Sequence, residues 1–241
     1  MMDMSGADLA AVAAAAVLGV LLGPLLAQIV EQAPNRERVS VSLRPAPSGV
    51  IEHAGRRSRD LAVRVLAPLA LALAAARFGA SLAVLPYLVF YAALLVLSAI
   101  DIEHHRLPDN VVFPALGITT ALIIGVSTVL EGPARALPAL VGAGVYFLLL
   151  AVPWFIYPKG LGFGDVKLAA LLGLHIGWIY AGFIQGVALI LYSLVVACGI
   201  GVATGVGVMI ARRKRAEFPF GPALAVGTVV IITFSDAILG G

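Results

Sequence analysis

The sequence predicts an all-α integral membrane protein, a multi-pass bundle of about eight transmembrane helices. Of its 241 residues, 61% are hydrophobic and only 12% are charged, whereas soluble domains have about 25% charged residues. The mean hydropathy of +1.04 means that most of the chain cannot face water. Apolar runs of about 20 residues, the length that crosses a bilayer core of about 30 Å, recur along the chain.

Eight apolar segments are the candidate spans. They are residues 8–30, 61–79, 81–101, 111–130, 137–157, 165–180, 182–210 and 221–238. The first follows a start that holds Asp3 and Asp8 but no basic residue, so we expect a retained span and not a signal peptide. The sixth is the shortest and contains glycine.

The basic residues predict the orientation of the spans. Fourteen of the 16 Lys and Arg lie in, or one turn from, the connections 31–60, 102–110, 158–164 and 211–220. Cytoplasmic loops are rich in Lys and Arg, so we expect these connections in the cytoplasm and both termini outside. The net charge of +3 follows from these loops, so we expect contact with anionic membrane lipid and no nucleic-acid partner.

The cysteine content argues against a metal site. The only cysteine is Cys198, which lies in an apolar run and is interpreted as a small packed hydrophobe. Because the chain has no CxxC pair, we expect neither a thiolate zinc site nor any other cofactor.

Two aspartates are expected at the same depth in the membrane. Asp101 ends the third span and Asp165 opens the sixth, both on the cytoplasmic side. Carboxylates near a membrane core are rare and mark functional sites. Peptide hydrolysis needs one ionised carboxylate to take a proton from water and one protonated carboxyl to stabilise the oxyanion. Two close carboxylates achieve this because both do not ionise together, so the pair predicts an aspartic peptidase.

Several neighbouring residues are candidate supporting groups. Gly162 and Gly164 lack a Cβ, so the backbone before Asp165 is expected to bend and to admit a substrate strand. Lys167 is expected either to reach lipid headgroups or to pair with Asp165. Pro108 would fix the turn before the fourth span.

Other interpretations of these residues remain open at this point. Asp165 could be an N-cap, Asp101 could belong to a hydrated helix end, and His104 and His105 could be solvated loop residues. Asp109 is expected to cap the fourth span together with Asn110. Under this interpretation the protein is a non-enzymatic transporter or secretion-system subunit, in which the aspartates act as an ion relay or as caps. A third possibility is an aspartic protease that cuts within a membrane helix.

Three ordered segments resemble the type IV prepilin peptidase family. Asp101 followed by Pro108-Asp109-Asn110 is similar to the first aspartate segment of the family. The segment 162–168 (GFGDVKL) resembles its GxGDxKL motif, and 218–224 (FPFGPAL) resembles its PFGP segment. Three matches in the right order are far more specific than a lone GxGD.

This resemblance implies an aspartic endopeptidase of the bacterial cytoplasmic membrane, with Asp101 and Asp165 as the catalytic pair. It implies cleavage of the leader of a prepilin or pseudopilin on the cytoplasmic side. Gly162, Gly164, Lys167, Pro108 and Asp109 would then support catalysis or substrate binding.

The resemblance also predicts two regions in the chain. Residues 61–241 would form the membrane-embedded peptidase domain. Residues 1–60 would hold the first span and a reduced, cysteine-free counterpart of the region of longer members that is associated with zinc and N-methylation. Methyltransferase activity is therefore not expected.

Overall fold

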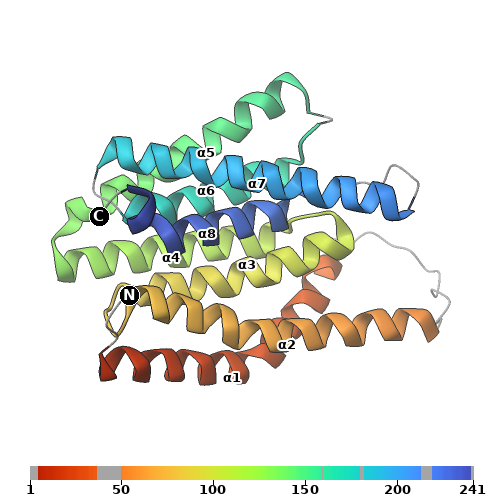
Figure 1. Cartoon of the computed structure of the whole chain (residues 1–241), viewed down its shortest axis with the longest axis horizontal. Coiled ribbons are helices and arrows are strands. Elements are labelled where there is room, and N and C mark those ends of the chain that lie inside the picture. Colours follow the sequence, from red (N-terminus) through yellow and green to blue (C-terminus); the bar gives the residue numbers. More distant parts are fainter. Residues whose placement is uncertain (1–4, 37–49, 159, 180–181, 213–218, 240–241) are drawn as a thin grey trace. The chain divides into compact units, whose positions relative to one another are not determined.

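The computed structural model describes residues 5–36, 50–158, 160–179, 182–212 and 219–239, and these residues form helices and no strand. The helices are α1 (Gly6–Arg36), α2 (Val50–Phe78), α3 (Val84–His104), α4 (Asp109–Leu130), the short 3₁₀ helix η1 (Pro133–Ala136), α5 (Leu137–Ile156), α6 (Phe163–Ile179), α7 (Phe183–Arg212) and α8 (Gly221–Leu239) (Figure 1). The prediction of an all-α bundle is confirmed, and each predicted span corresponds to one helix.

Seven of the described helices are long and apolar enough to cross a membrane. The eighth, α6, has 17 residues and rises about 26 Å at 1.5 Å per residue, somewhat less than the bilayer core. The chain is therefore a multi-pass membrane protein in which one helix is shorter than a usual span.

The first two helices extend further than the predicted spans. Helix α1 continues to Arg36 and α2 already begins at Val50, so the expected connector 31–60 is partly helical. Its middle, residues 37–49, lies outside the described residues. Hydropathy identifies only the part of a helix in the lipid core, whereas backbone hydrogen bonding continues beyond it.

The chain divides into two compact units, residues 1–100 and 101–241. The first unit contains α1, α2 and most of α3. Helices α1 and α2 pack closely at Gly19, where a Cβ would lie 2.4 Å from Cα of Pro68. Small residues permit such close approach of membrane helices. The boundary near residue 60 that the resemblance implies stays a prediction.

A glycine and an aspartate organise the turn between α2 and α3. Gly79 has φ of +61°, and its N–H donates to Ala75 O at 2.8 Å, which is the usual left-handed end of a helix. The next residue, Ala80, donates its N–H to Asp8 Oδ1 at 3.2 Å. Asp8 therefore ties the start of α1 to this turn.

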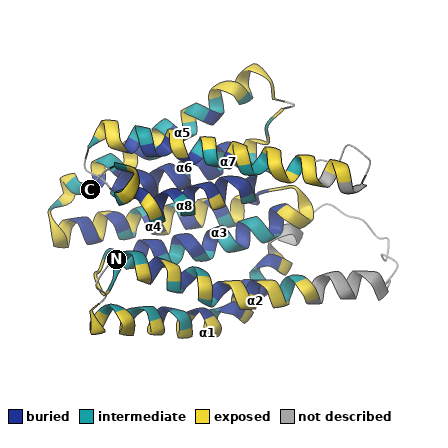
Figure 2. Cartoon of the chain, in the orientation of Figure 1, coloured by how far each residue is buried: buried dark blue, intermediate teal, exposed yellow. Residues whose placement is uncertain are grey.

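Helix α6 forms the core of the second unit. It packs against α4, α5, α7 and α8, and Figure 2 shows it almost entirely buried. The contact with α5 is closest at Gly173, where a Cβ would lie 2.2 Å from Gly142 O. Asp165 thus lies in the first turn of the most enclosed helix in this unit.

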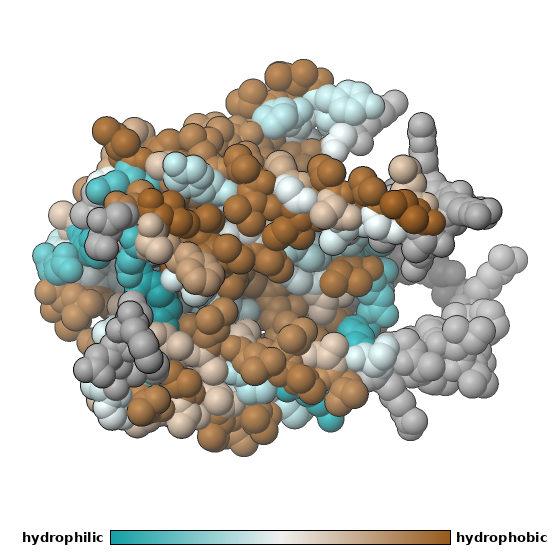
Figure 3. Space-filling view, viewed as in Figure 1, coloured by the Kyte–Doolittle hydropathy of each residue, from teal (hydrophilic) through white to brown (hydrophobic). Residues whose placement is uncertain are grey.

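The outer helix faces are apolar. On α7, Figure 3 shows hydrophobic side chains along the visible face. Its exposed large hydrophobic residues include Leu191, Val195, Val202, Val206, Met209 and Ile210. Exposed apolar area of this extent marks a surface covered by lipid or protein, in agreement with the membrane assignment.

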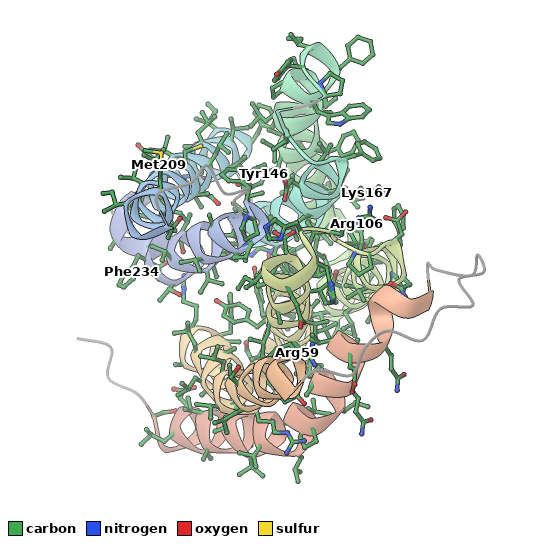
Figure 4. All side chains as sticks on the ribbon, turned by 90° about the vertical axis from the view of Figure 1, so that its right-hand side faces the viewer. Arg59, Arg106, Tyr146, Lys167, Met209 and Phe234 are labelled. Atoms are coloured by element: carbon green, nitrogen blue, oxygen red, sulfur yellow. The ribbon has the colours of Figure 1, made fainter. Side chains whose placement is uncertain are left out.

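A buried chain of hydroxyl groups joins three helices of the second unit. The hydroxyl oxygen of Tyr146 in α5 lies 3.3 Å from Ser193 Oγ of α7. Ser193 Oγ lies 2.9 Å from Thr228 Oγ1 of α8. Figure 4 shows Tyr146 in the interior beside α7. Interhelical hydrogen bonds in membranes contribute about 0.6 kcal/mol each.

We expect Ser193→Ala and Tyr146→Phe each to destabilise the protein by about 1 kcal/mol. Ser193 bonds both Tyr146 and Thr228, and the Tyr146 hydroxyl also interacts with Thr228. Either variant therefore removes two interhelical hydrogen bonds of about 0.6 kcal/mol each. Thermal unfolding in detergent micelles measures the loss, and an unchanged unfolding temperature in either variant would contradict this arrangement.

Candidate active site

Asp101 lies in the last turn of α3 and is only 5% exposed. Its Oδ2 accepts a hydrogen bond of 3.0 Å from the backbone N–H of Gly221, the first residue of α8. The first N–H groups of a helix have no partner within the helix, and they carry the positive end of its dipole. The carboxylate of Asp101 therefore lies at a position that favours negative charge.

The chain leaves α3 through a tight turn at His105. This residue has φ of +52°, and its N–H donates to Asp101 O at 2.8 Å, so it ends the helix in the left-handed conformation. The next helix begins at Asp109 with Pro108 at its N-cap, and no side chain caps it. The expectation that Asp109 caps α4 is therefore wrong: Pro108 occupies the cap position, and its preset φ suits the entry to a helix.

Asp165 is the third residue of α6 and is 8% exposed. It lies inside the first turn, whereas an N-cap lies before it. The backbone of Gly162 approaches its carboxylate so closely that a Cβ on Gly162 would lie 3.3 Å from Asp165 Oδ2.

The two aspartates line one cavity of about 730 Å³. Its wall also includes His105, Pro158, Gly160, Leu161, Gly162, Cys198, Gly201, Val202, Pro219 and Phe220. The carboxylates of Asp101 and Asp165 interact electrostatically across it. The cavity thus combines a carboxylate pair with an open volume that a peptide segment can enter.

Two residues of the wall have positions that the sequence interpretation did not include. Cys198 is exposed and lines the cavity, so its interpretation as a packed hydrophobe is wrong. His105 is exposed and lies outside the helices, as expected of a solvated loop residue, but it also lines the cavity and interacts electrostatically with Asp101. Neither position could be assigned from the sequence, because each depends on which helices enclose the cavity.

Lys167 and Asp109 meet each other outside the cavity. Lys167 Nζ donates to Asp109 Oδ1, and lies over the rings of Phe113 at 5.4 Å and Phe163 at 4.9 Å. Figure 4 shows Lys167 in this peripheral position. Of the two alternatives for Lys167, pairing with Asp165 is not what the structure shows; its carboxylate partner belongs to α4.

Gly164 also lies outside the cavity wall. A Cβ on Gly164 would lie 2.9 Å from Leu107 Cβ, so this glycine permits the close packing of α6 against the turn before α4. Gly162 and Gly164 do not have positive φ. What Gly162 and Gly164 share is that another group lies very close to each of them. Neither adopts an unusual backbone conformation.

The described residues contain no group of three or more His, Cys, Asp or Glu side chains that could hold a metal ion.

Comparison of the sequence with known protein families gives a match. Residues 88–206 match the sequence profile of the type IV leader peptidase family. Through this segment, the chain is similar to the type IV leader peptidase family. The matched segment contains both Asp101 and Asp165, and the resemblance seen in the sequence motifs is confirmed.

Several curated relatives of this family are similar to the chain. A prepilin leader peptidase/N-methyltransferase of Bacillus subtilis (strain 168) is 31% identical over 172 residues, which is 70% of this chain and 63% of that protein. Proteins of the same name are 34% identical in Stutzerimonas stutzeri (60% of this chain, 48% of that protein) and 33% identical in Burkholderia pseudomallei (strain 1026b) (76% and 56%). The chain thus spans about half to three fifths of their length. No solved structure matches it.

Gly221 is the residue of the site that the sequence did not single out. The family motif 218–224 includes it, but the role of its N–H as the partner of Asp101 depends on the approach of α8 to the end of α3. One sequence signal could have indicated this role: Gly221 is a glycine at the first position of a helix. Most residues are tolerated at that position, so a glycine there suggests that another group lies close to the backbone.

Proposed function

We propose that this protein is a member of the type IV leader peptidase family and a membrane aspartic endopeptidase. Its substrates would be type IV prepilin-like or pseudopilin proteins, whose leader it removes at the cytoplasmic face of the bacterial cytoplasmic membrane. The observation that carries this proposal is the single cavity lined by Asp101 and Asp165. The printed names of the relatives, prepilin leader peptidase/N-methyltransferase, support the substrate class.

The proposed reaction needs only the two carboxyl groups and water. One carboxylate takes a proton from a water molecule while the water oxygen forms a bond to the scissile carbonyl carbon. The other, protonated carboxyl donates a hydrogen bond to the carbonyl oxygen as it becomes an oxyanion. The tetrahedral intermediate then collapses, the C–N bond breaks, and the proton taken from water passes to the departing nitrogen.

The wall of the cavity suits an extended peptide. Gly160 and Gly162 contribute backbone without side chains on one side, and Gly201 does so on the α7 side. A substrate strand can therefore approach the carboxylates closely. Methyl transfer is not part of the proposal, because the chain covers 63% or less of the relatives whose names include it.

Co-expression with a prepilin tests the proposed activity. We expect the substrate to become shorter by its leader, as seen on a gel, when the wild-type chain is present. Full-length prepilin in cells that accumulate the wild-type chain would contradict the peptidase function. That result would favour the transporter or secretion-subunit alternative, which no observation here supports.

Reporter fusions test the cytoplasmic placement of the site. Fusions at Arg56, Arg106 and Arg213 are expected to report cytoplasm, and a fusion at Arg135 the opposite side, because the basic connections are retained inside. The structural placement of Arg213 lies outside the described residues. Cytoplasmic signal from the Arg135 fusion would overturn the orientation while leaving the peptidase chemistry open.

A further inference from the structure

The N-terminus of α8 distinguishes the two aspartates from each other. We propose that Asp101 is the ionised member of the pair, held by the backbone N–H of Gly221, and that Asp165 carries the proton. This assignment deepens the proposed peptidase function and rests on it for its catalytic consequence. Gly221 is then a positioning residue, since it acts on the substrate only through Asp101.

The contact between Gly221 and Asp101 suits a carboxylate anion. The donor is a backbone N–H at the first position of a 19-residue helix, and the acceptor Oδ2 is 3.0 Å away in a buried environment. Hydrogen bonds to an ionised acceptor are roughly twice as strong as neutral ones, and the helix dipole adds to them. The contact therefore stabilises the anion more than the neutral acid.

Only glycine allows this contact. A Cβ on residue 221 would lie 2.7 Å from Asp101 Oδ2 and 3.3 Å from its Cγ. Real Cβ atoms do not approach an oxygen to 2.7 Å, so even alanine would push the carboxylate away from the helix start. Glycine at position 221 therefore lets the backbone N–H come within hydrogen-bonding distance of Asp101 Oδ2.

The charged groups around the two carboxylates differ. Asp165 also lies in a first helical turn and has a backbone hydrogen bond from Gly162, but the nearest basic residue of its own helix, Lys167, is paired with Asp109. The titratable side chains facing Asp101 in the cavity are Asp165 of α6, His105 after α3 and Cys198 of α7. A protonated His105 attracts the negative charge of Asp101. The nearby charged groups therefore favour Asp101 as the ionised member of the pair.

The catalytic consequence is a definite division of roles. Asp101 takes the proton from the attacking water, and Asp165 donates the hydrogen bond to the carbonyl oxygen. At the end of the cycle the departing nitrogen receives the proton that Asp101 took, which restores the ionised Asp101 and the protonated Asp165.

Carbodiimide labelling tests the assignment without a substrate. Dicyclohexylcarbodiimide reacts with a protonated carboxylic acid and not with a carboxylate, and both aspartates line the same cavity. In the purified full chain at neutral pH, mass spectrometry is expected to find Asp165 labelled at least several-fold more than Asp101. Equal labelling, or preferential labelling of Asp101, would overturn the assignment.

A matched pair of glycine variants tests the role of Gly221. Gly221→Ala is expected to raise the labelling of Asp101 relative to Asp165. The control is Gly227→Ala in the same helix, where the new Cβ would lie 2.8 Å from Ser193 O. This control disturbs the packing of α8 on α7 but does not touch Asp101, so its labelling ratio should stay at the wild-type value. If Gly221→Ala does not accumulate, the wild-type ratio alone decides the assignment.

The pH dependence of cleavage provides a second readout. If Asp101 is the base, loss of its N–H partner disfavours its ionised form, so Gly221→Ala should move the acidic limb of the rate profile to higher pH. If Asp101 were the acid, the alkaline limb would move instead. Gly227→Ala should lower the rate, if at all, without moving either limb. A wild-type chain that cleaves no prepilin would refute the proposed function, whereas the labelling result would still decide the protonation assignment.

Discussion

Asp101→Asn and Asp165→Asn are each expected to abolish leader cleavage while the protein still accumulates in the membrane. Asparagine keeps the size and some of the hydrogen bonding of aspartate, but it cannot take a proton from water or carry the shared acidic proton. General acid–base catalysis contributes about 10²- to 10⁴-fold to rates, so a loss in this range is expected for each variant. Conversion of a co-expressed prepilin, followed on a gel at equal enzyme abundance, measures it.

Asp60→Asn is a suitable control for this pair. Asp60 is a half-buried aspartate of α2 whose Oδ1 pairs with the Arg59 guanidinium at 3.0 Å, and surface ion pairs contribute little to stability. This variant should cleave at the wild-type rate. If Asp101 and Asp165 were only helix caps, their replacement would cost roughly 1 kcal/mol of stability and leave activity intact. Full processing by either variant would end the case for the aspartic mechanism.

Valine at Gly162 or Gly164 is expected to reduce cleavage by about 10²-fold, the size of effect that a misplacement of about 1 Å produces in an active site. At Gly162 the first added atom would lie 3.3 Å from Asp165 Oδ2, and at Gly164 it would lie 2.9 Å from Leu107 Cβ. The first change displaces a reacting carboxylate. The second moves the start of α6 away from the turn before α4.

Two comparisons show whether the effect belongs to these positions. Phe163→Leu should stay near the wild-type rate, because the Phe163 ring lies against Trp154 at 4.7 Å on a partly exposed surface, and leucine replaces most of its apolar area. Gly117→Val introduces the same side chain on α4, where no atom lies within 4 Å of the new Cβ, and should also be tolerated. Valine variants of Gly162 and Gly164 that accumulate normally and cleave at the wild-type rate would show that this segment does not position Asp165.

The sequence alone determined the helices and the pair of carboxylates. Transfer of an apolar segment from water to lipid depends on the composition of that segment, so hydropathy identified each helix without knowledge of its neighbours. The boundaries that it missed, at Arg36 and Val50, lie where the chain is polar and hydropathy carries no signal. Asp101 and Asp165 were found for a related reason: a carboxylate at the end of an apolar segment is rare, and the motif around each is local.

Only the tertiary structure decided which groups meet. Gly162 and Gly164 were expected to bend the backbone, but the structure shows that a neighbouring group approaches each of them. Lys167 could have paired with Asp165 by sequence spacing, but it pairs with Asp109 of another helix. The N–H of Gly221 reaches Asp101 across 120 residues. Hydrogen bonds and ion pairs are short-range, so their partners depend on how helices distant in sequence pack together, and that packing cannot be read from the composition of any one segment.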